Sequence, residues 1–237
     1  MKWFLAITVA LLVVGCGAPK PAQPAAQPPT EPPPTQVADT TQQTPPAGTV
    51  TGSTIVAPPV EKGMLKDTLV VTKLPENLYL NIKVKDYGTM KIKFYTKDAP
   101  KNVANVANLG IKGFYNGLTF HRLIPGFMIQ GGDPRGTGQG GPGYTVPAEF
   151  SSHKHVKGTM AMARLPDQAN PKKESSGSQF YICFAPTPFL DGQYTVIGQL
   201  VEGMDVLDKL EEVKTAGDPT NKPLTPVVMD QVWVTTE

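Results

Sequence analysis

Alternating apolar and polar positions predict β-strands in the later two thirds of the chain. Residues 78–84 alternate, residues 86–88 contain a turn with a glycine, and residues 90–94 alternate again. Successive side chains on a strand point to opposite faces, so this pattern predicts a half-buried hairpin. Two more runs of strand character, over 194–200 and 227–234, predict further strands.

Two helices are predicted among these strands. The first begins after Asp98, a good N-cap residue, has Pro100 in its first turn, and ends at Gly110 or Gly113. The second is an amphipathic helix over 204–212. The apolar positions expected to face the core are Val103, Val106, Leu109, Val206, Leu207 and Leu210. Many strands with two helices favour a closed antiparallel β-barrel.

Candidate chemistry is concentrated in the run 120–133. If two short strands meet at the turn Pro125-Gly126, Met128 and Gln130 share one face and Arg122 returns toward it. The result is an apolar patch with one guanidinium and one amide at its edge. The chain has 3 arginines beside 19 lysines, which favours a geometric role for Arg122. An ordinary amphipathic strand pair with a surface arginine is the alternative.

The run 120–133 resembles the signature of the cyclophilins, the peptidyl-prolyl cis/trans isomerases. Segments 158–163, 178–183 and 189–192 agree with that family in the expected order, and the resemblance extends over 78–234. It implies an eight-stranded antiparallel β-barrel capped by two α-helices. It also implies an isomerase that needs no metal, nucleotide or other cofactor and acts on proline-containing polypeptides.

The resemblance also implies roles for individual residues. Arg122, Phe127 and Gln130 would be catalytic, and Phe127 would share a proline pocket with Met128, Tyr181 and Leu190. The backbone near Arg164 would orient the peptide, Gln179 would line the adjacent groove, and Phe189 would lie at the pocket rim. The complete substrate-binding set is Met128, Gly136, Ala163, Arg164, Gln179, Tyr181, Phe189, Leu190 and Tyr194.

Four of these positions depart from the best-known eukaryotic pattern. Tyr181 replaces phenylalanine, Phe189 replaces tryptophan, Tyr194 replaces histidine and Arg164 replaces asparagine. The catalytic arginine is retained, but the tryptophan position helps to hold cyclosporin, so we expect weak inhibition by that drug. The polar loop 164–177 is longer than in many cyclophilins.

Other motifs favour structural roles. The glycine-rich run 136–143 lacks the Gly-Lys-Ser/Thr of a phosphate loop and is expected to allow tight turns at the edge of the groove. His153 and His155 lack a nearby cysteine or an obvious acidic partner, so a metal site there is the weaker hypothesis. His121 is expected to pack in the core, and Cys183 is expected to be a buried structural thiol.

The N-terminus predicts export and lipid anchoring. Lys2 precedes the apolar run 3–14, which is too short to span a bilayer and is typical of a secretory signal. Gly15-Cys16 at its end resembles a bacterial lipoprotein box, so residues 1–15 would be removed and Cys16 would be lipidated. Several acyl chains on one residue anchor a protein stably. A secretory signal with an incidental cysteine is the alternative.

Residues 16–62 are predicted to be a disordered tether. Residues 17–62 hold 12 of the 25 prolines of the chain and no aromatic residue, a composition that buries too little surface to fold. The tether would hold the domain away from a membrane or wall. A ligand for a proline-binding domain, or a substrate for the chain's own active site, are the other interpretations.

Residues 63–237 then form one domain of ordinary size. The net charge of +2 gives no indication of nucleic-acid binding, and we expect a monomer. The sequence therefore predicts a prolyl isomerase of exported proteins, anchored on the extracytoplasmic face of a bacterial cell membrane or outer membrane. The alternative is a non-catalytic chaperone or scaffold module that binds proline-containing peptides.

Overall fold

The fold was determined as a computed structural model, which describes Leu65 and residues 69–237. The predicted signal peptide 1–15, the lipidation site Cys16 and the predicted tether 16–62 lie outside the described residues. The predicted domain boundary at residue 63 lies outside them as well.

Most of the described chain is β-structure. The strands are β1 (Tyr79–Val84), β2 (Gly88–Phe94), β3 (Thr119–Phe120), β4 (Arg122–Ile124), β5 (Met128–Gly131), β6 (Thr145–Val146), β7 (Thr159–Met162), β8 (Ser175–Ser176), β9 (Phe180–Cys183), β10 (Val196–Glu202) and β11 (Val227–Thr235). The helices are α1 (Pro100–Ile111) and α2 (Met204–Glu211), with short 3-10 helices η1 (Val71–Lys73) and η2 (Pro188–Leu190).

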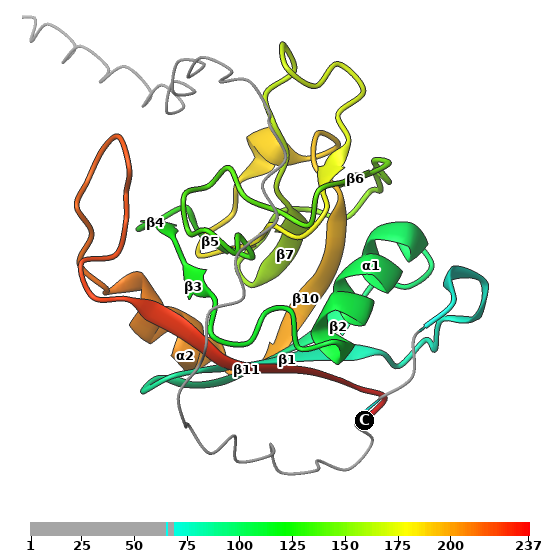
Figure 1. The fold of residues 1–237 in the computed structure, drawn as a ribbon, viewed down its shortest axis with the longest axis horizontal. Helices are drawn as coiled ribbons and strands as arrows, with labels where there is room; N and C mark the ends of the chain where they lie inside the picture. The colour runs from blue at the N-terminus through cyan, green and yellow to red at the C-terminus, as the bar shows by residue number, and fades with distance from the viewer. Residues whose placement is uncertain (1–64, 66–68) are drawn as a thin grey trace, which may run out of the picture. The chain divides into compact units, whose positions relative to one another are not determined.

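One antiparallel sheet curves until its two edges meet. Its order is β3-β11-β1-β2-β10-β7-β9-β5-β4, and β6 pairs separately with β8. The edge strands β3 and β4 are separated only by His121, so they are two parts of one stretch that pairs with β11 on one side and β5 on the other. Counting that stretch once gives eight strands, which confirms the predicted barrel in a nearly closed form. Figure 1 shows the long strands β1, β2 and β11 opposite the shorter β4, β5 and β7.

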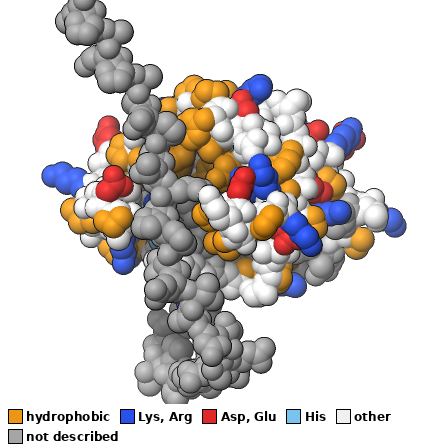
Figure 2. Space-filling model, turned by 90° about the horizontal axis from the view of Figure 1, so that it is seen from above, with side chains coloured by type: hydrophobic (Ala, Val, Ile, Leu, Met, Phe, Trp, Pro, Cys, Tyr) orange, Lys and Arg blue, Asp and Glu red, His pale blue; other side chains and the backbone are white. Residues whose placement is uncertain are grey.

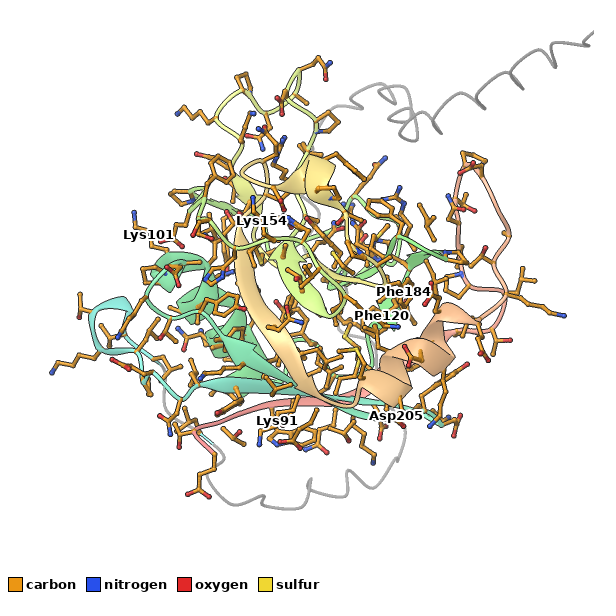
Figure 3. All side chains as sticks on the ribbon, turned by 180° about the vertical axis from the view of Figure 1, so that it is seen from behind. Lys91, Lys101, Phe120, Lys154, Phe184 and Asp205 are labelled. Carbon is orange, nitrogen blue, oxygen red and sulfur yellow. The ribbon has the colours of Figure 1, made fainter. Side chains whose placement is uncertain are left out.

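The predicted hairpin is confirmed as β1 and β2. Tyr79 pairs with Lys93 and Val84 pairs with Gly88, and Asp86 in the turn has a positive φ of 67°. The side chains that face inward are fully buried, as the alternation predicts: Leu80, Ile82, Met90 and Ile92. Figure 3 shows Phe120 and Phe184 inside the barrel, whereas the exposed Lys101 lies at its edge on α1.

Both predicted helices form, but the start of α1 differs from the prediction. Its N-cap residue is Ala99, without a side-chain hydrogen bond, and Pro100 is the first helical residue. Asp98 is not the cap because its carboxylate instead lies 3.1 Å from His153 Nε2. The helix ends at Ile111, between the two glycines that the sequence offered as stops.

The two helices cover different strands. A methyl group added at Gly110 of α1 would contact Leu80 of β1 and Val234 of β11, each at 3.3 Å. One added at Gly88, at the start of β2, would lie 2.8 Å from Val206 of α2. Val206, Leu207 and Leu210 are buried as predicted, and so are Val103 and Val106, while Leu109 is partly buried.

Charged side chains are mixed on the face of the protein shown in Figure 2. Basic and acidic groups lie close together there, between hydrophobic ones, so this face carries no extended field of one sign. Within the part of the chain that the structure describes, none of the helices has both the length and the hydrophobicity needed to cross a membrane.

The junction between β10 and α2 requires a glycine. Gly203 has a φ of +87°, and a Cβ there would lie 2.3 Å from the carbonyl oxygen of Thr89. We predict that Gly203→Ala lowers the free energy of unfolding by about 3–4 kcal/mol, measured by urea denaturation. Gly117→Ala is the matched control, because Gly117 has a φ of +77° with no atom within 4 Å of its added Cβ, and should cost only about 1–2 kcal/mol. Equal losses for both variants would contradict the steric account.

Candidate active site

The hairpin of β4 and β5 brings Arg122 and Gln130 together. The two residues are direct cross-strand partners, and the turn between the strands contains Gly126 with a φ of 72°. Arg122 Nη1 donates to Gln130 Oε1 over 3.4 Å. Ile124 and Met128 form the next pair on this face, so apolar side chains continue directly from the two polar ones. The predicted return of Arg122 toward the face of Met128 and Gln130 is confirmed.

A hydrogen-bond chain fixes the Gln130 amide. Gln130 Nε2 donates to Gln179 Oε1 over 2.9 Å. Gln179 Nε2 in turn donates to the carbonyl oxygens of Gly138, at 3.0 Å, and Gly140, at 2.7 Å. Because carbonyl oxygens only accept, both glutamine amides have one defined orientation, and Gln130 Oε1 faces the arginine.

Partial burial also acts on the guanidinium. Burial lowers the pKa of Arg122, and the charge of Asp218 opposes that shift. An arginine begins from a pKa so high that it keeps its proton at neutral pH. The β4–β5 hairpin therefore presents a permanent positive charge in a fixed orientation.

Beside the guanidinium lies a cluster of apolar side chains from β5, β9 and η2 and from the segments next to β5, β7 and β10. We call Met128, Tyr181, Leu190, Phe127, Ala163 and Tyr194 the apolar cluster. Tyr181 and Tyr194 meet edge to face with ring centroids 5.9 Å apart, and Phe127 lies 5.7 Å from the Phe189 ring. Phe189 is 54% exposed and forms the outer rim. Cys183 lies in the same packing group, fully buried, and burial raises the pKa of its thiol to about 11, as expected for a structural cysteine.

Arg164 does not extend into open solvent. Its guanidinium carbon lies 4.6 Å from the centre of the Tyr194 ring, and Nε donates to the carbonyl oxygen of Gln193. Nη1 donates to Asp167 Oδ1 at 2.6 Å, so the side chain ties the 164–177 loop to the strand-connecting segment that carries Tyr194. Lys173 strengthens the same loop with an ion pair to Asp167.

A groove of about 620 Å³ continues from Gln130 and Gln179 between two loops. One wall is the glycine-rich loop and the other is the 164–177 loop. Four of the residues predicted to bind substrate or to act in catalysis line it: Gln130, Ala163, Arg164 and Gln179. Gly136 does not line it, and a Cβ added there would lie 3.6 Å from Thr119 Oγ1. The glycines that line the groove instead are Gly138, Gly140, Gly141 and Gly143.

Sequence reasoning missed several residues of this groove, among them Arg135, Tyr144, Asn170 and Glu174. All four lie in loops without periodic patterns, so no sequence signal marked them individually. The one available clue for Arg135 was that the 3 arginines of the chain all fall between positions 122 and 164.

Comparisons with known proteins agree with this geometry. Residues 79–234 match the family model of the cyclophilin type peptidyl-prolyl cis-trans isomerase/CLD. The chain belongs to the cyclophilin family. It is therefore a peptidyl-prolyl cis-trans isomerase of the cyclophilin type, with the nearly closed barrel described above.

Several bacterial relatives carry the same activity in their names. A peptidyl-prolyl cis-trans isomerase of Synechococcus elongatus is 51% identical over 112 residues, covering 47% of this chain and 73% of the relative. One from Helicobacter pylori is 42% identical over 144 residues, covering 59% and 84%. Peptidyl-prolyl cis-trans isomerase B of Bacillus subtilis is 41% identical over 142 residues, covering 56% and 95%.

Solved structures resemble this cyclophilin as well. A cyclophilin type isomerase of Cryptosporidium parvum is 31% identical with a TM-score of 0.61, covering 67% of this chain and 98% of that one. The same isomerase solved in the presence of the dipeptide Ala-Pro gives the same identity and TM-score.

The glycine-rich loop of this cyclophilin is wrapped around Asp133. The carboxylate accepts backbone hydrogen bonds from Arg135, Thr137, Gly138 and Gly140, and another from the Thr137 hydroxyl. Burial raises the pKa of Asp133, but these hydrogen bonds outweigh burial and lower it to about 2. A Cβ at Gly140 would lie 1.7 Å from Asp133 Oδ1, so this position must be glycine.

The two neighbouring histidines each have an acidic partner, contrary to the sequence analysis. His153 stacks on Tyr95 with ring centroids 3.7 Å apart and pairs with Asp98, and His155 Nδ1 lies 3.0 Å from Asp191 Oδ1. These partners are distant in the chain, so spacing could not identify them. Across Leu65 and 69–237, no group of three or more potential metal ligands is found.

His121 is buried in this cyclophilin, as the sequence predicts, with no hydrogen-bond partner for either ring nitrogen. Burial lowers the pKa of its imidazole. It separates β3 from β4 and lies against the glycine-rich loop, because a Cβ at Gly138 would lie 3.7 Å from its Nε2.

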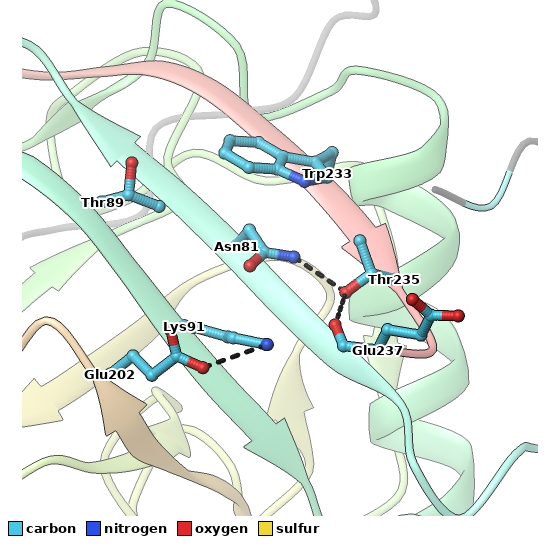
Figure 4. Close-up of a pocket in the computed structure, with 7 residues that line it drawn as sticks. All are labelled: Asn81, Thr89, Lys91, Glu202, Trp233, Thr235 and Glu237. Carbon is cyan, nitrogen blue, oxygen red and sulfur yellow. Dashed lines mark hydrogen bonds and ion pairs between the residues drawn. The ribbon is translucent and has the colours of Figure 1, made fainter. Parts of the chain in front are cut away.

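A second, smaller pocket of about 270 Å³ opens on the outer side of the sheet (Figure 4). It is lined by Asn81, Thr89, Lys91, Glu202, Trp233, Thr235 and Glu237. Its polar groups bond mainly to one another: Asn81 Nδ2 donates to Thr235 Oγ1, and Lys91 pairs with Glu202. None of the predicted site residues contributes to it.

Asp133 should make the stability of the glycine-rich loop depend on pH. The folded-state pKa lies below the ordinary value of 3.8, so the stabilisation is complete above about pH 4 and is lost as pH falls through 2. We predict that Asp133→Asn lowers the free energy of unfolding by about 2 kcal/mol at pH 7, measured by urea denaturation. The difference between wild type and variant should shrink toward pH 2, and a difference independent of pH would contradict this account.

Proposed function

We propose that this cyclophilin accelerates X-Pro rotation in exported proteins, with Arg122 as its key catalytic residue and lipidated Cys16 as its anchor. The catalytic part of the proposal is supported by one observation above all. A fixed guanidinium lies across a strand pair from an oriented amide and directly beside the apolar cluster.

The reaction itself defines what such a site must do. An X-Pro bond has a cis/trans barrier of about 18–20 kcal/mol because rotation removes amide resonance. As the bond twists, the proline nitrogen gains lone-pair character. A hydrogen-bond donor at that nitrogen stabilises the twisted state more than either planar state, and such a difference lowers the barrier. Each 1.36 kcal/mol gained there accelerates rotation about tenfold.

The residues around Arg122 divide the remaining tasks. Met128, Phe127, Tyr181 and Leu190 would hold the proline ring in the apolar cluster, with Phe189 at its rim. Gln130 would form a hydrogen bond with the peptide backbone, as donor or acceptor, while it orients Arg122.

The segments that carry the substrate would lie on either side of that pocket. Gln179, Ala163 and the backbone near Arg164 would hold the residues that precede proline in the groove. Tyr194 would close the pocket under the Arg164 side chain, which covers its ring. We retain Gly136 only as a turn residue of the loop. The Ala-Pro dipeptide used with the Cryptosporidium relative is the natural minimal ligand to test here.

Removing the guanidinium should abolish turnover. We predict that Arg122→Ala lowers kcat/KM for an Ala-Pro tetrapeptide by about 100-fold or more, because the charged donor proposed to act at the twisting nitrogen is lost. Arg122→Lys should retain only a small part of the activity, because an ammonium group cannot reproduce the oriented fork. Both rates are measured with the purified full-length protein by exchange NMR.

Lys209→Ala is the control for that experiment. Lys209 pairs with Asp205 on the exposed surface of α2, so its loss should change neither rate nor folding. If Arg122→Ala stays folded and fully active, the catalytic proposal is wrong. If wild type binds the peptide without accelerating exchange, the protein acts as a binding module.

Anchoring is supported by the sequence of the N-terminus. A positive residue, a short apolar run and Gly15-Cys16 stand in the order expected for a bacterial lipoprotein, followed by a proline-rich segment that can span distance. The protein would then work on the extracytoplasmic face of the cell membrane or outer membrane, where exported chains fold.

Lipid labelling tests this proposal directly. In bacteria fed radioactive palmitate, the wild-type chain should be labelled and found with the membranes, whereas Cys16→Ser should lose both label and membrane association. Cys183→Ser is the matched control, because Cys183 is the other cysteine of the chain and is buried. An unlabelled, exported and soluble wild-type protein would show that the signal is an ordinary secretory one.

A further inference from the structure

A chain of buried and partly buried hydrogen bonds begins at Tyr181 of the apolar cluster. The Tyr181 hydroxyl lies 3.0 Å from His155 Nε2, and His155 Nδ1 lies 3.0 Å from Asp191 Oδ1. The backbone N–H of His155 donates to the same carboxylate oxygen over 2.9 Å. None of these bonds involves Arg122, Gln130 or Gln179, so this chain is separate from the one that orients the guanidinium.

Chemistry defines the direction of each bond. An ionised carboxylate can only accept, so His155 carries its proton on Nδ1 and donates it to Asp191. Nε2 is then the acceptor, and the Tyr181 hydroxyl must be the donor. Hydrogen bonds from His155 lower the pKa of Asp191 to about 2, and Lys154 pairs with its other oxygen at 3.2 Å, so the carboxylate is charged at neutral pH.

Because His155 and Tyr181 are buried, loss of these hydrogen bonds would leave polar groups without a partner in the protein interior. His155 is 1% exposed and Tyr181 is 5% exposed, and burial lowers the pKa of the imidazole. A buried hydroxyl or ring nitrogen that loses its partner keeps the full cost of desolvation. Tyr181 replaces the phenylalanine usual in the best-known cyclophilins, so the acceptor meets a need that phenylalanine does not have.

The bonds also join two separate walls of the apolar cluster. Tyr181 belongs to β9, whereas Asp191 directly follows η2, which carries Phe189 and Leu190. The His155 carbonyl accepts a backbone hydrogen bond from Thr187, immediately before η2, over 2.8 Å. One residue therefore contacts both the ring on β9 and the segment on either side of η2.

We propose that His155 is a positioning residue for the proline pocket, which it builds by holding the Tyr181 ring at a fixed distance from the segment 188–190. This inference rests on the proposed role of the apolar cluster as the site of the proline ring. His155 does not reach the reacting atoms. Its loss should therefore weaken peptide binding and leave the rotation of bound peptide nearly unchanged.

Two amide variants separate the bonds that His155 makes. His155→Asn has a shorter side chain that can keep the Asp191 bond but cannot reach the Tyr181 hydroxyl. His155→Gln places its carbonyl oxygen near the position of Nε2, where it can accept that hydroxyl. We expect the dissociation constant of an Ala-Pro tetrapeptide to rise about tenfold in His155→Asn and by no more than about threefold in His155→Gln.

Exchange NMR of the full-length protein measures the two relevant quantities together. The dissociation constant should change as stated, while the interconversion rate of bound peptide stays within about twofold of wild type. Tyr181→Phe should weaken binding about as much as His155→Asn, and the double variant should be no worse than either single one. Three results would overturn the proposal. The losses of peptide affinity could multiply in the double variant, or they could be equal for His155→Asn and His155→Gln. Peptide binding could also be unchanged in a His155→Asn variant that is less stable than wild type.

Tyr181→Phe keeps the test possible if His155→Asn does not fold. A failure of the proposed function is recognised separately, because wild-type protein would then not accelerate exchange at all. In that case the NMR signals of the Tyr181 ring still test whether His155 positions this ring. They should shift in His155→Asn and remain unchanged in Arg122→Ala, and a Tyr181 ring insensitive to His155→Asn would overturn it.

Discussion

A permanent charge held beside an apolar pocket is the constraint on which this structure depends. Arg122 makes no ion pair with a carboxylate of the described residues, and a close carboxylate would take up the donors that a substrate needs. Two neutral glutamines meet that requirement. Gln130 accepts from the guanidinium and is itself held by Gln179, which is anchored on two glycine carbonyls. The orientation of the Arg122 guanidinium is therefore fixed by oriented amide groups and not by a negatively charged partner.

Strand pairing and loop contacts elsewhere in the barrel hold Arg122 and the pocket residues in place. The stretch 119–124 closes the sheet, so the strand that carries Arg122 is paired through β3 with β11 and through β4 with β5. The glycine-rich loop that receives Gln179 is itself ordered around the buried carboxylate of Asp133. On the other side of the pocket, His155 links Tyr181 to the segment that carries Leu190. Among the residues that the structure describes, buried polar side-chain atoms thus have specific partners, except for Asn102 Oδ1, both ring nitrogens of His121 and Trp233 Nε1.

Sequence patterns predicted the barrel because alternation and helix periodicity are local properties. The β1–β2 hairpin, both helices and the facing of Met128 and Gln130 follow from side-chain direction alone. The partners of His153, His155 and Gln179 could not be predicted, because Asp98, Asp191 and the glycine carbonyls approach them only after folding. The same limit explains Asp98, a good N-cap by type that pairs with His153 instead, and Arg164, whose side chain folds over Tyr194.

A crystal structure of the protein with an Ala-Pro peptide bound would test the central claim most directly. The account predicts the proline ring between Met128 and Leu190, with a guanidinium nitrogen of Arg122 directed at the prolyl nitrogen within hydrogen-bond reach, about 3 Å. Gln130 should remain bonded to Gln179 in that complex. A proline ring lodged elsewhere, or a guanidinium turned away toward Asp218 with the peptide bound, would contradict the account.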